Sequence, residues 1–174
     1  FLNHDFAKSL EVANMGLKKN PRHAAFNRLA MYNNTDLKRF EEALKAADVF
    51  FNECDKADYS YLDYMYYGHL LEELKKYDEA VGQYEKAVEL DPTKTDLYKN
   101  ISSVYEQKND YKKAIGAYHK YYSSLEKEKQ TPDLQFQLGR LYYGAGTQPD
   151  SLTINVEERK HCLLYTSPSP RDRT

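Results

Sequence analysis

The sequence predicts an all-α fold built from repeated helical hairpins. Its 174 residues are 41% hydrophobic and 30% charged, which is typical of an ordinary globular domain. Alternating runs of Val, Ile and Thr, the main signal of a strand, do not occur. Apolar residues recur instead at three- and four-residue spacing, which is the period of an amphipathic helix, and the whole pattern returns after 34 residues.

Residues 1–22 are predicted to contain the second helix of a repeat whose first helix is missing. Phe6, Ser9 and Ala13 share one face of this helix, and Asn20-Pro21 ends it. The sequence starts at Phe1 without an initiator Met or a signal peptide pattern. We therefore expect this start to be internal to a longer protein.

Residues 23–60 are predicted to form the first complete hairpin. Phe26, Leu29 and Ala30 share a face of its first helix. The second helix has a similar face, formed by Phe40, Ala43, Ala47 and Phe50. Ala30 is expected to be the small residue at which the two helices approach closely, because a larger side chain would overpack that contact.

Residues 61–94 carry the clearest hairpin pattern. Tyr64, Tyr67 and Leu71 share a face of the first helix, with Gly68 beside them. The second helix repeats the pattern with Ala80, Tyr84 and Ala87 on one face. Pro92 ends this helix. We expect the tyrosine rings to fill the space between hairpins, with their hydroxyl groups at the rim.

Residues 95–131 repeat this hairpin 34 positions later. The recurring residues are Tyr98, Ile101, Ser102, Tyr105, Ala114, Tyr118 and Tyr121. A helix–turn–helix unit of 34 residues is the tetratricopeptide repeat. The sequence resembles this family over residues 1–161, with looser spacing outside the two central hairpins.

Residues 132–161 are predicted to be a repeat that is cut off within its second helix. Pro132 is expected to begin the first helix, where a missing N–H costs nothing, and Gly144-Ala145-Gly146 to end it. Asn155 and Glu158 have the spacing of a capping box for a further helix. Without that helix, Leu138, Leu141 and Tyr142 would be left exposed. We therefore expect self-association through the truncated ends.

Residues 162–174 are predicted to be a non-native, disordered tail. Residues 162–172 resemble the translation of a transposase adapter used to prepare sequencing libraries. The alternative is a native tail rich in Ser and Pro. If the tail is non-native, Cys54 is the single native cysteine and an internal disulfide is excluded.

Charge and hydropathy exclude two classes of partner. The 25 Lys and Arg residues are balanced by 27 Asp and Glu, which gives a net charge of −2 and not the basic excess that nucleic acid requires. No run of about 18 apolar residues occurs, so no membrane span is predicted.

No catalytic residue, metal site or cofactor is expected. His69, Glu72 and Glu73 could meet on a helix surface, but a structural metal site needs more ligands, and an exposed cluster is the simpler interpretation. Cys54 has no base near it in the sequence, and no nucleophile, base and orienting group occur together.

The resemblance implies an α-solenoid, a right-handed superhelix whose inner groove is lined by the first helix of each repeat. Carrying the family's groove positions over gives the peptide-groove residues Asn27, Met31, Leu62, Met65, His69, Lys99, Ser103, Phe136 and Arg140. Chaperone-binding members hold a peptide carboxylate with a cluster of cationic and amide side chains. The positions matching that cluster are Asn27, Met31, Tyr66, Asp96 and Asn100, so chaperone tails are not predicted ligands.

The sequence therefore predicts a non-catalytic scaffold that binds a peptide or a partner helix in the groove of a tetratricopeptide array. The alternative is a substrate-recruiting or regulatory array of a larger enzyme whose catalytic domain lies outside residues 1–161.

Overall fold

The computed structural model describes residues 5–54 and 58–146. All regular secondary structure in these ranges is helical, which confirms the all-α class. The chain divides into two compact units, Phe1–Pro92 and Thr93–Thr174, which are described separately. The predicted tail 162–174 and the capping box at Asn155 lie outside the described residues.

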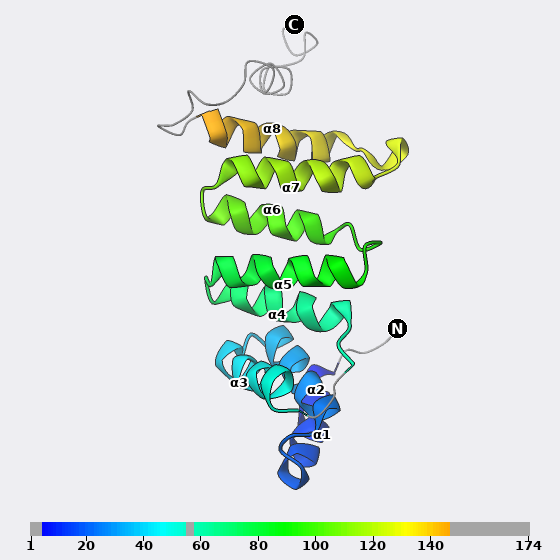
Figure 1. Cartoon of the computed structure of the whole chain (residues 1–174), viewed down its shortest axis with the longest axis vertical. Helices are drawn as coiled ribbons and strands as arrows, with labels where there is room; N and C mark the ends of the chain where they lie inside the picture. The colour runs from blue at the N-terminus through cyan, green and yellow to red at the C-terminus, as the bar shows by residue number, and fades with distance from the viewer. Residues whose placement is uncertain (1–4, 55–57, 147–174) are drawn as a thin grey trace, which may run out of the picture. The chain divides into compact units, whose positions relative to one another are not determined.

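The described residues of unit 1 form five helices, which are labelled in Figure 1. They are α1 (Phe6–Lys19), α2 (Ala24–Asp36), α3 (Phe40–Asn52), α4 (Tyr61–Glu73) and α5 (Tyr77–Leu90). α2 pairs with α3 and α4 pairs with α5 as two hairpins, while α1 packs on α2. α4 also contacts α2 and α3, so the two hairpins of this unit are packed together.

Unit 2 contains three α-helices and one short 3-10 turn among its described residues. They are α6 (Leu97–Gln107), α7 (Tyr111–Ser124), η1 (Lys127–Lys129) and α8 (Pro132–Gly146). Figure 1 shows α6, α7 and α8 side by side, with the chain reversing direction between them. α7 packs against both α6 and α8.

The C-terminal turn of α8 has a packing role that the sequence did not predict. Pro132 begins the helix as predicted, and Gly144 to Gly146 form its last described turn. Ala145 is buried, and a Cβ atom on Gly144 would clash with the Tyr111 ring of α7. Gly144 therefore allows a close contact between helices, and Gly146 is the last residue of α8 that the structure describes.

The turn within each complete hairpin has the same backbone geometry. Lys38, Lys75 and Asn109 have φ angles of 57°, 59° and 59°, in the left-handed region. In the first of these turns the Arg39 N–H donates to the Asn34 carbonyl at 2.8 Å, and the other two turns have the equivalent bond. This is a Schellman motif, which satisfies carbonyl groups at the end of the first helix. The three motifs give an alignment of the hairpins that does not depend on side chains.

This alignment corrects the sequence-based register of the first hairpin. Gly68 and Ser102 lie seven residues before their left-handed residues, and the residue seven before Lys38 is Met31. The sequence alignment placed Ala30 at this position and is therefore wrong by one residue.

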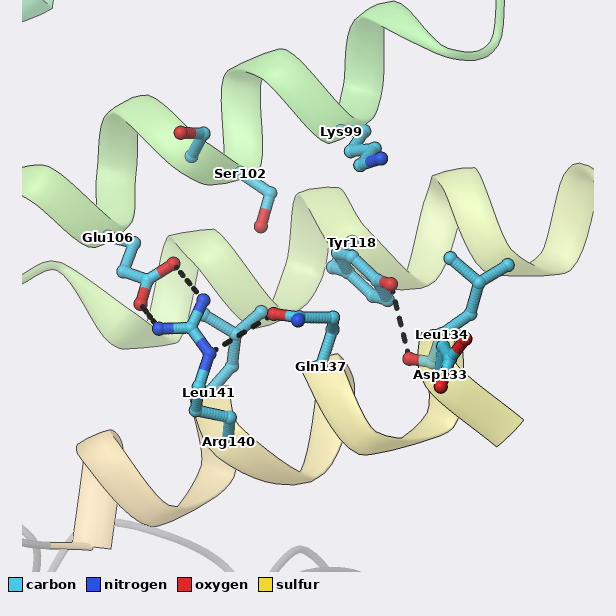
Figure 2. Close-up of a pocket in the computed structure, with 10 residues that line it drawn as sticks. Lys99, Ser102, Glu106, Tyr118, Asp133, Leu134, Gln137, Arg140 and Leu141 are labelled. Atoms are coloured by element: carbon cyan, nitrogen blue, oxygen red, sulfur yellow. Dashed lines mark hydrogen bonds and ion pairs between the residues drawn. The ribbon is translucent and has the colours of Figure 1, made fainter. Parts of the chain in front are cut away.

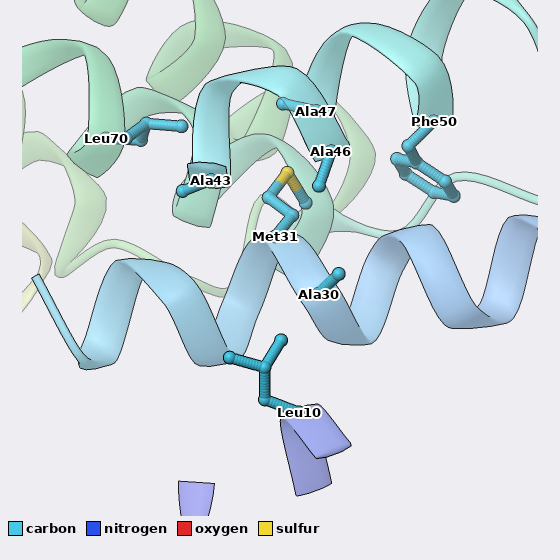
Figure 3. Packing of buried hydrophobic residues seen from close by; sticks show 8 residues of the cluster. All are labelled: Leu10, Ala30, Met31, Ala43, Ala46, Ala47, Phe50 and Leu70. Carbon is cyan, nitrogen blue, oxygen red and sulfur yellow. The ribbon is translucent and has the colours of Figure 1, made fainter. Parts of the chain in front are cut away.

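The core of unit 1 explains how the first hairpin accommodates a methionine at this position. Met31 is 0% exposed, and Figure 3 shows its side chain directed at three alanines of α3: Ala43, Ala46 and Ala47. These small partners leave the volume that the Met31 side chain fills. In the second hairpin the same contact is made by a glycine against a large ring, Gly68 against Tyr84.

The core of unit 2 includes the residues that the sequence prediction left exposed. Leu138, Leu141 and Tyr142 are 3%, 2% and 6% exposed, because they pack on Ala114 and Tyr118 of α7. The prediction that they face water is therefore wrong. The exposed apolar side chains of α8 are Phe136 and Tyr143, which are 63% and 62% exposed.

Two glycine substitutions in the α4–α5 hairpin are expected to have opposite effects. A Cβ atom on Gly68 would lie 2.9 Å from the fully buried Tyr84 ring, so Gly68→Ala should lower the free energy of unfolding by about 1–3 kcal/mol through overpacking. A Cβ atom on Gly82 would have no neighbouring atom within 4 Å, so Gly82→Ala should raise it by about 0.5–1 kcal/mol. Urea denaturation followed by circular dichroism measures both, and stabilisation by Gly68→Ala would contradict the packing.

Candidate functional site

The candidate site is a pocket of about 410 Å³ in unit 2, between α6 and α8 (Figure 2). It brings together three of the predicted groove residues, Lys99, Ser103 and Arg140. Residues four or seven positions apart on a helix share one face, and both α6 and α8 supply such a series to the pocket. The full lining is Lys99, Ser102, Ser103, Glu106, Tyr118, Asp133, Leu134, Gln137, Arg140 and Leu141.

The inner wall of the pocket is apolar and fixed. Leu141 and Tyr118 are buried, and the Tyr118 hydroxyl donates to the Leu134 carbonyl at 3.1 Å. Burial, with a smaller effect of nearby Tyr121, raises the pKa of Tyr118 to about 12, so the hydroxyl stays protonated at neutral pH. The Ser102 hydroxyl donates to the Ala114 carbonyl at 2.8 Å. The polar atoms of Tyr118 and Ser102 are therefore engaged within the protein.

One end of the pocket is closed by a bidentate ion pair. Arg140 donates from its two terminal nitrogens to the two carboxylate oxygens of Glu106, at 2.5 and 2.9 Å. Its Nε donates to the Gln137 side-chain oxygen at 3.1 Å. Since a guanidinium group only donates, the Gln137 amide must turn its oxygen to Arg140, and its NH₂ group remains for an acceptor.

The other end of the pocket carries two exposed charges. Lys99 comes from α6 and Asp133 from the first turn of α8. Together with Glu106 and Arg140, these residues give the lining two positive and two negative charges. The exposed Ser103 hydroxyl adds a group that can both donate and accept.

Two predicted groove residues are corrected by the structure. Asn27 is 3% exposed, and its amide donates to the Pro21 and His23 carbonyls at 2.8 and 3.2 Å. Met31 is fully buried against α3. Because of the one-residue shift in register, Arg28 and Tyr32 take the positions that match Lys99 and Ser103.

Arg28 and Tyr32 form a polar network that the sequence analysis did not find. Both side chains reach the buried carboxylate of Asp63 on α4. Arg28 Nε and Nη2 donate to it at 2.7 and 3.0 Å, and the Tyr32 hydroxyl donates at 2.6 Å. The Ser60 backbone N–H also donates, at 2.7 Å, within a capping box at the start of α4. Burial, and next the hydrogen bond to Asp63, raise the pKa of Tyr32 well above its usual range.

The remaining predicted groove residues are accessible. Leu62, Met65 and His69 lie on α4 of unit 1; Leu62 is 37% exposed, Met65 is half-buried and His69 is exposed. Phe136 is exposed on α8 and does not line the pocket.

The described residues provide no metal site and no membrane-spanning helix. No group of three or more His, Cys, Asp or Glu side chains in residues 5–54 and 58–146 is placed to hold a metal ion. Near His69, Glu72 accepts a hydrogen bond from the Tyr84 hydroxyl at 2.9 Å. Within the same part of the chain, every helix is too short or too polar to cross a membrane.

Comparison with protein-family models and known proteins gives one family match. Residues 68–109 match the TPR repeat model. No curated protein matches the sequence significantly.

Solved structures resemble the chain over most of its length. The C-terminal part of a TPR repeat-containing protein from Cytophaga hutchinsonii has a TM-score of 0.71 at 22% identity, covering 94% of this chain and 61% of the other. MamA has a TM-score of 0.69 at 20% identity, covering 92% and 88%. YrrB, described as a TPR protein with an unusual peptide-binding site, has a TM-score of 0.68 at 12% identity, covering 93% and 78%. At these identities the likeness establishes the helical-repeat fold.

Proposed function

Because this chain contains tetratricopeptide repeats, we propose that it is a non-catalytic protein-interaction module that binds a short segment of a partner protein between α6 and α8. The observation that carries the proposal is the pocket itself, which has an apolar inner wall and accessible hydrogen-bonding groups at its rim. The peptide-binding site named for YrrB, a protein with the same repeat fold, supports it. In the alternative function, a substrate-recruiting or regulatory array of a larger enzyme, the same pocket would bind the recruited protein.

Further contacts are proposed outside the pocket. Leu62, Met65 and His69 on α4 and Phe136 on α8 are accessible side chains at the family's groove positions. Exposed apolar side chains of this kind mark surfaces that bind other proteins. The alternative role of Phe136 is self-association, in which the exposed apolar side chains of α8 contact a second copy of the chain.

Filling the pocket is expected to abolish peptide binding. Ser103 is exposed on α6 and lines the pocket, so Ser103→Trp should fill it without disturbing the core. The probe is a set of peptides selected on the wild-type chain from a displayed library of random dodecapeptides. We expect their affinity to fall at least about tenfold, measured by fluorescence anisotropy, because a well-packed contact of this kind contributes more than about 1 kcal/mol.

The matched control is Ser123→Trp. Ser123 is an exposed serine on α7 that does not line the pocket, so the same substitution there should leave the affinity unchanged. Equal affinities for wild type and Ser103→Trp, or equal losses in the two variants, would contradict binding between α6 and α8.

A further inference from the structure

Resting on the proposed function, we propose that the pocket between α6 and α8 takes an uncharged aliphatic segment of the partner, and that Glu106 is the specificity-determining residue that excludes acidic segments. The proposal names the ligand class of the site and assigns a role to a residue that contacts Arg140. It is argued from the ion pair, the charge balance of the lining and the apolar wall.

The Arg140 guanidinium is the group in the pocket that is best suited to bind a carboxylate, and Glu106 is already bound to it. The planar fork of Arg140 matches the geometry of a carboxylate, and both of its terminal nitrogens are already bonded to Glu106. The Glu106 side chain is 24% exposed and the Arg140 side chain 49% exposed, so the anion is the more buried partner. An acidic ligand would have to displace Glu106 and leave its charge unpaired, which is costly in a partly buried position.

The rest of the lining provides no net attraction for an anion. Lys99 is the remaining cation of the pocket, and Asp133 at the start of α8 opposes it. Since Arg140 and Glu106 also cancel, the lining has no net charge. Electrostatic complementarity therefore favours an uncharged segment.

The groups left accessible suit the main chain and an aliphatic side chain. Arg140 holds the oxygen of the Gln137 amide, so the NH₂ group of Gln137 can donate to a main-chain carbonyl of the ligand. Tyr118, Leu134 and Leu141 form an apolar surface for a side chain such as leucine. Glu106 thus holds Arg140, which orients the Gln137 amide, and its negative charge also opposes the binding of an anionic ligand.

The test compares two defined peptide pools by NMR titration of the ¹⁵N-labelled full chain, which detects millimolar binding. The neutral pool contains end-blocked heptapeptides of serine with one central leucine. The acidic pool is identical except that the serines flanking the leucine are glutamates. Wild type is expected to prefer the neutral pool by about tenfold, since a like charge against Glu106 opposes the acidic pool. Glu106→Gln should reverse the preference because it frees the Arg140 fork.

Two further variants separate this effect from a general change in charge. Glu126→Gln removes an exposed carboxylate that pairs with Lys129 away from the pocket, and it should behave as wild type. Glu106→Gln combined with Arg140→Gln should lose the gained binding of the acidic pool. The NMR spectrum of each variant also reports whether it is folded.

The outcomes distinguish the specificity from the proposed function. If the neutral pool shifts the amide signals of α6 and α8 but Glu106→Gln does not change the preference, the role of Glu106 is overturned and peptide binding stands. If neither pool shifts those signals in wild type or in Glu106→Gln, peptide binding in this pocket fails as well.

Discussion

Asp63→Ala is expected to lower the free energy of unfolding of unit 1 by about 3–5 kcal/mol, because it removes one partner of a buried ion pair. The Asp63 side chain is 0% exposed and the Arg28 side chain 31% exposed. The alanine variant leaves the Arg28 guanidinium without its anion and the Tyr32 hydroxyl and Ser60 N–H without their acceptor. Urea denaturation, followed by circular dichroism and tyrosine fluorescence, measures the loss.

The matched control for Asp63→Ala is Asp48→Ala. Asp48 is an exposed aspartate on α3 of the same unit, so its substitution should change stability by less than about 0.5 kcal/mol. If Asp63→Ala were as stable as this control, the network of Arg28, Tyr32 and Asp63 would make no net contribution to holding α2 against α4.

The elements that could be predicted from the sequence are those whose pattern is local. Residues 61–94 and 95–131 repeat at the same spacing, and the structure has a helical hairpin in each. Pro132 was correctly expected to begin a helix, since a proline is tolerated in the first turn. The close contact at Gly144 was not predicted, because it depends on the Tyr111 ring of another helix.

The register of the first hairpin was the main error, and the sequence contained a signal that would have prevented it. Gly68 precedes Ala80 by 12 residues and Ser102 precedes Ala114 by 12, so the residue that matches them before Ala43 is Met31. The size of Ala30 favoured the wrong alignment. Residue size is a weak guide here, because the alanines of α3 compensate for a large partner.

The candidate pocket was only partly predicted for a similar reason. Helical periodicity placed Lys99, Ser103 and Arg140 on the right face, but it says nothing about which charges meet between hairpins. The two bidentate pairs join residues about one repeat apart, with separations of 35 residues for Arg28 and Asp63 and 34 for Glu106 and Arg140. Opposite charges separated by one repeat length are therefore the signal that would have found them.

Met31→Ala is the substitution that best separates the two registers. The structure places Met31 in the core, fully buried against the alanines of α3, so the variant should lose about 2–5 kcal/mol of unfolding free energy through the cavity it creates. If Met31 faced the groove, as the sequence alignment implies, the same substitution would weaken ligand binding and leave stability almost unchanged. Thermal or urea denaturation of the full chain measures the difference.

Met15→Ala provides the control for side-chain identity. Met15 is 61% exposed on α1 of the same unit, so its truncation removes the same atoms without opening a cavity and should change stability by less than about 0.5 kcal/mol. A stability loss at Met31 that is no larger than the loss at Met15 would restore the register with Ala30 between the helices. A large loss at Met31 alone would leave Arg28 and Tyr32 as the residues of α2 at the groove positions.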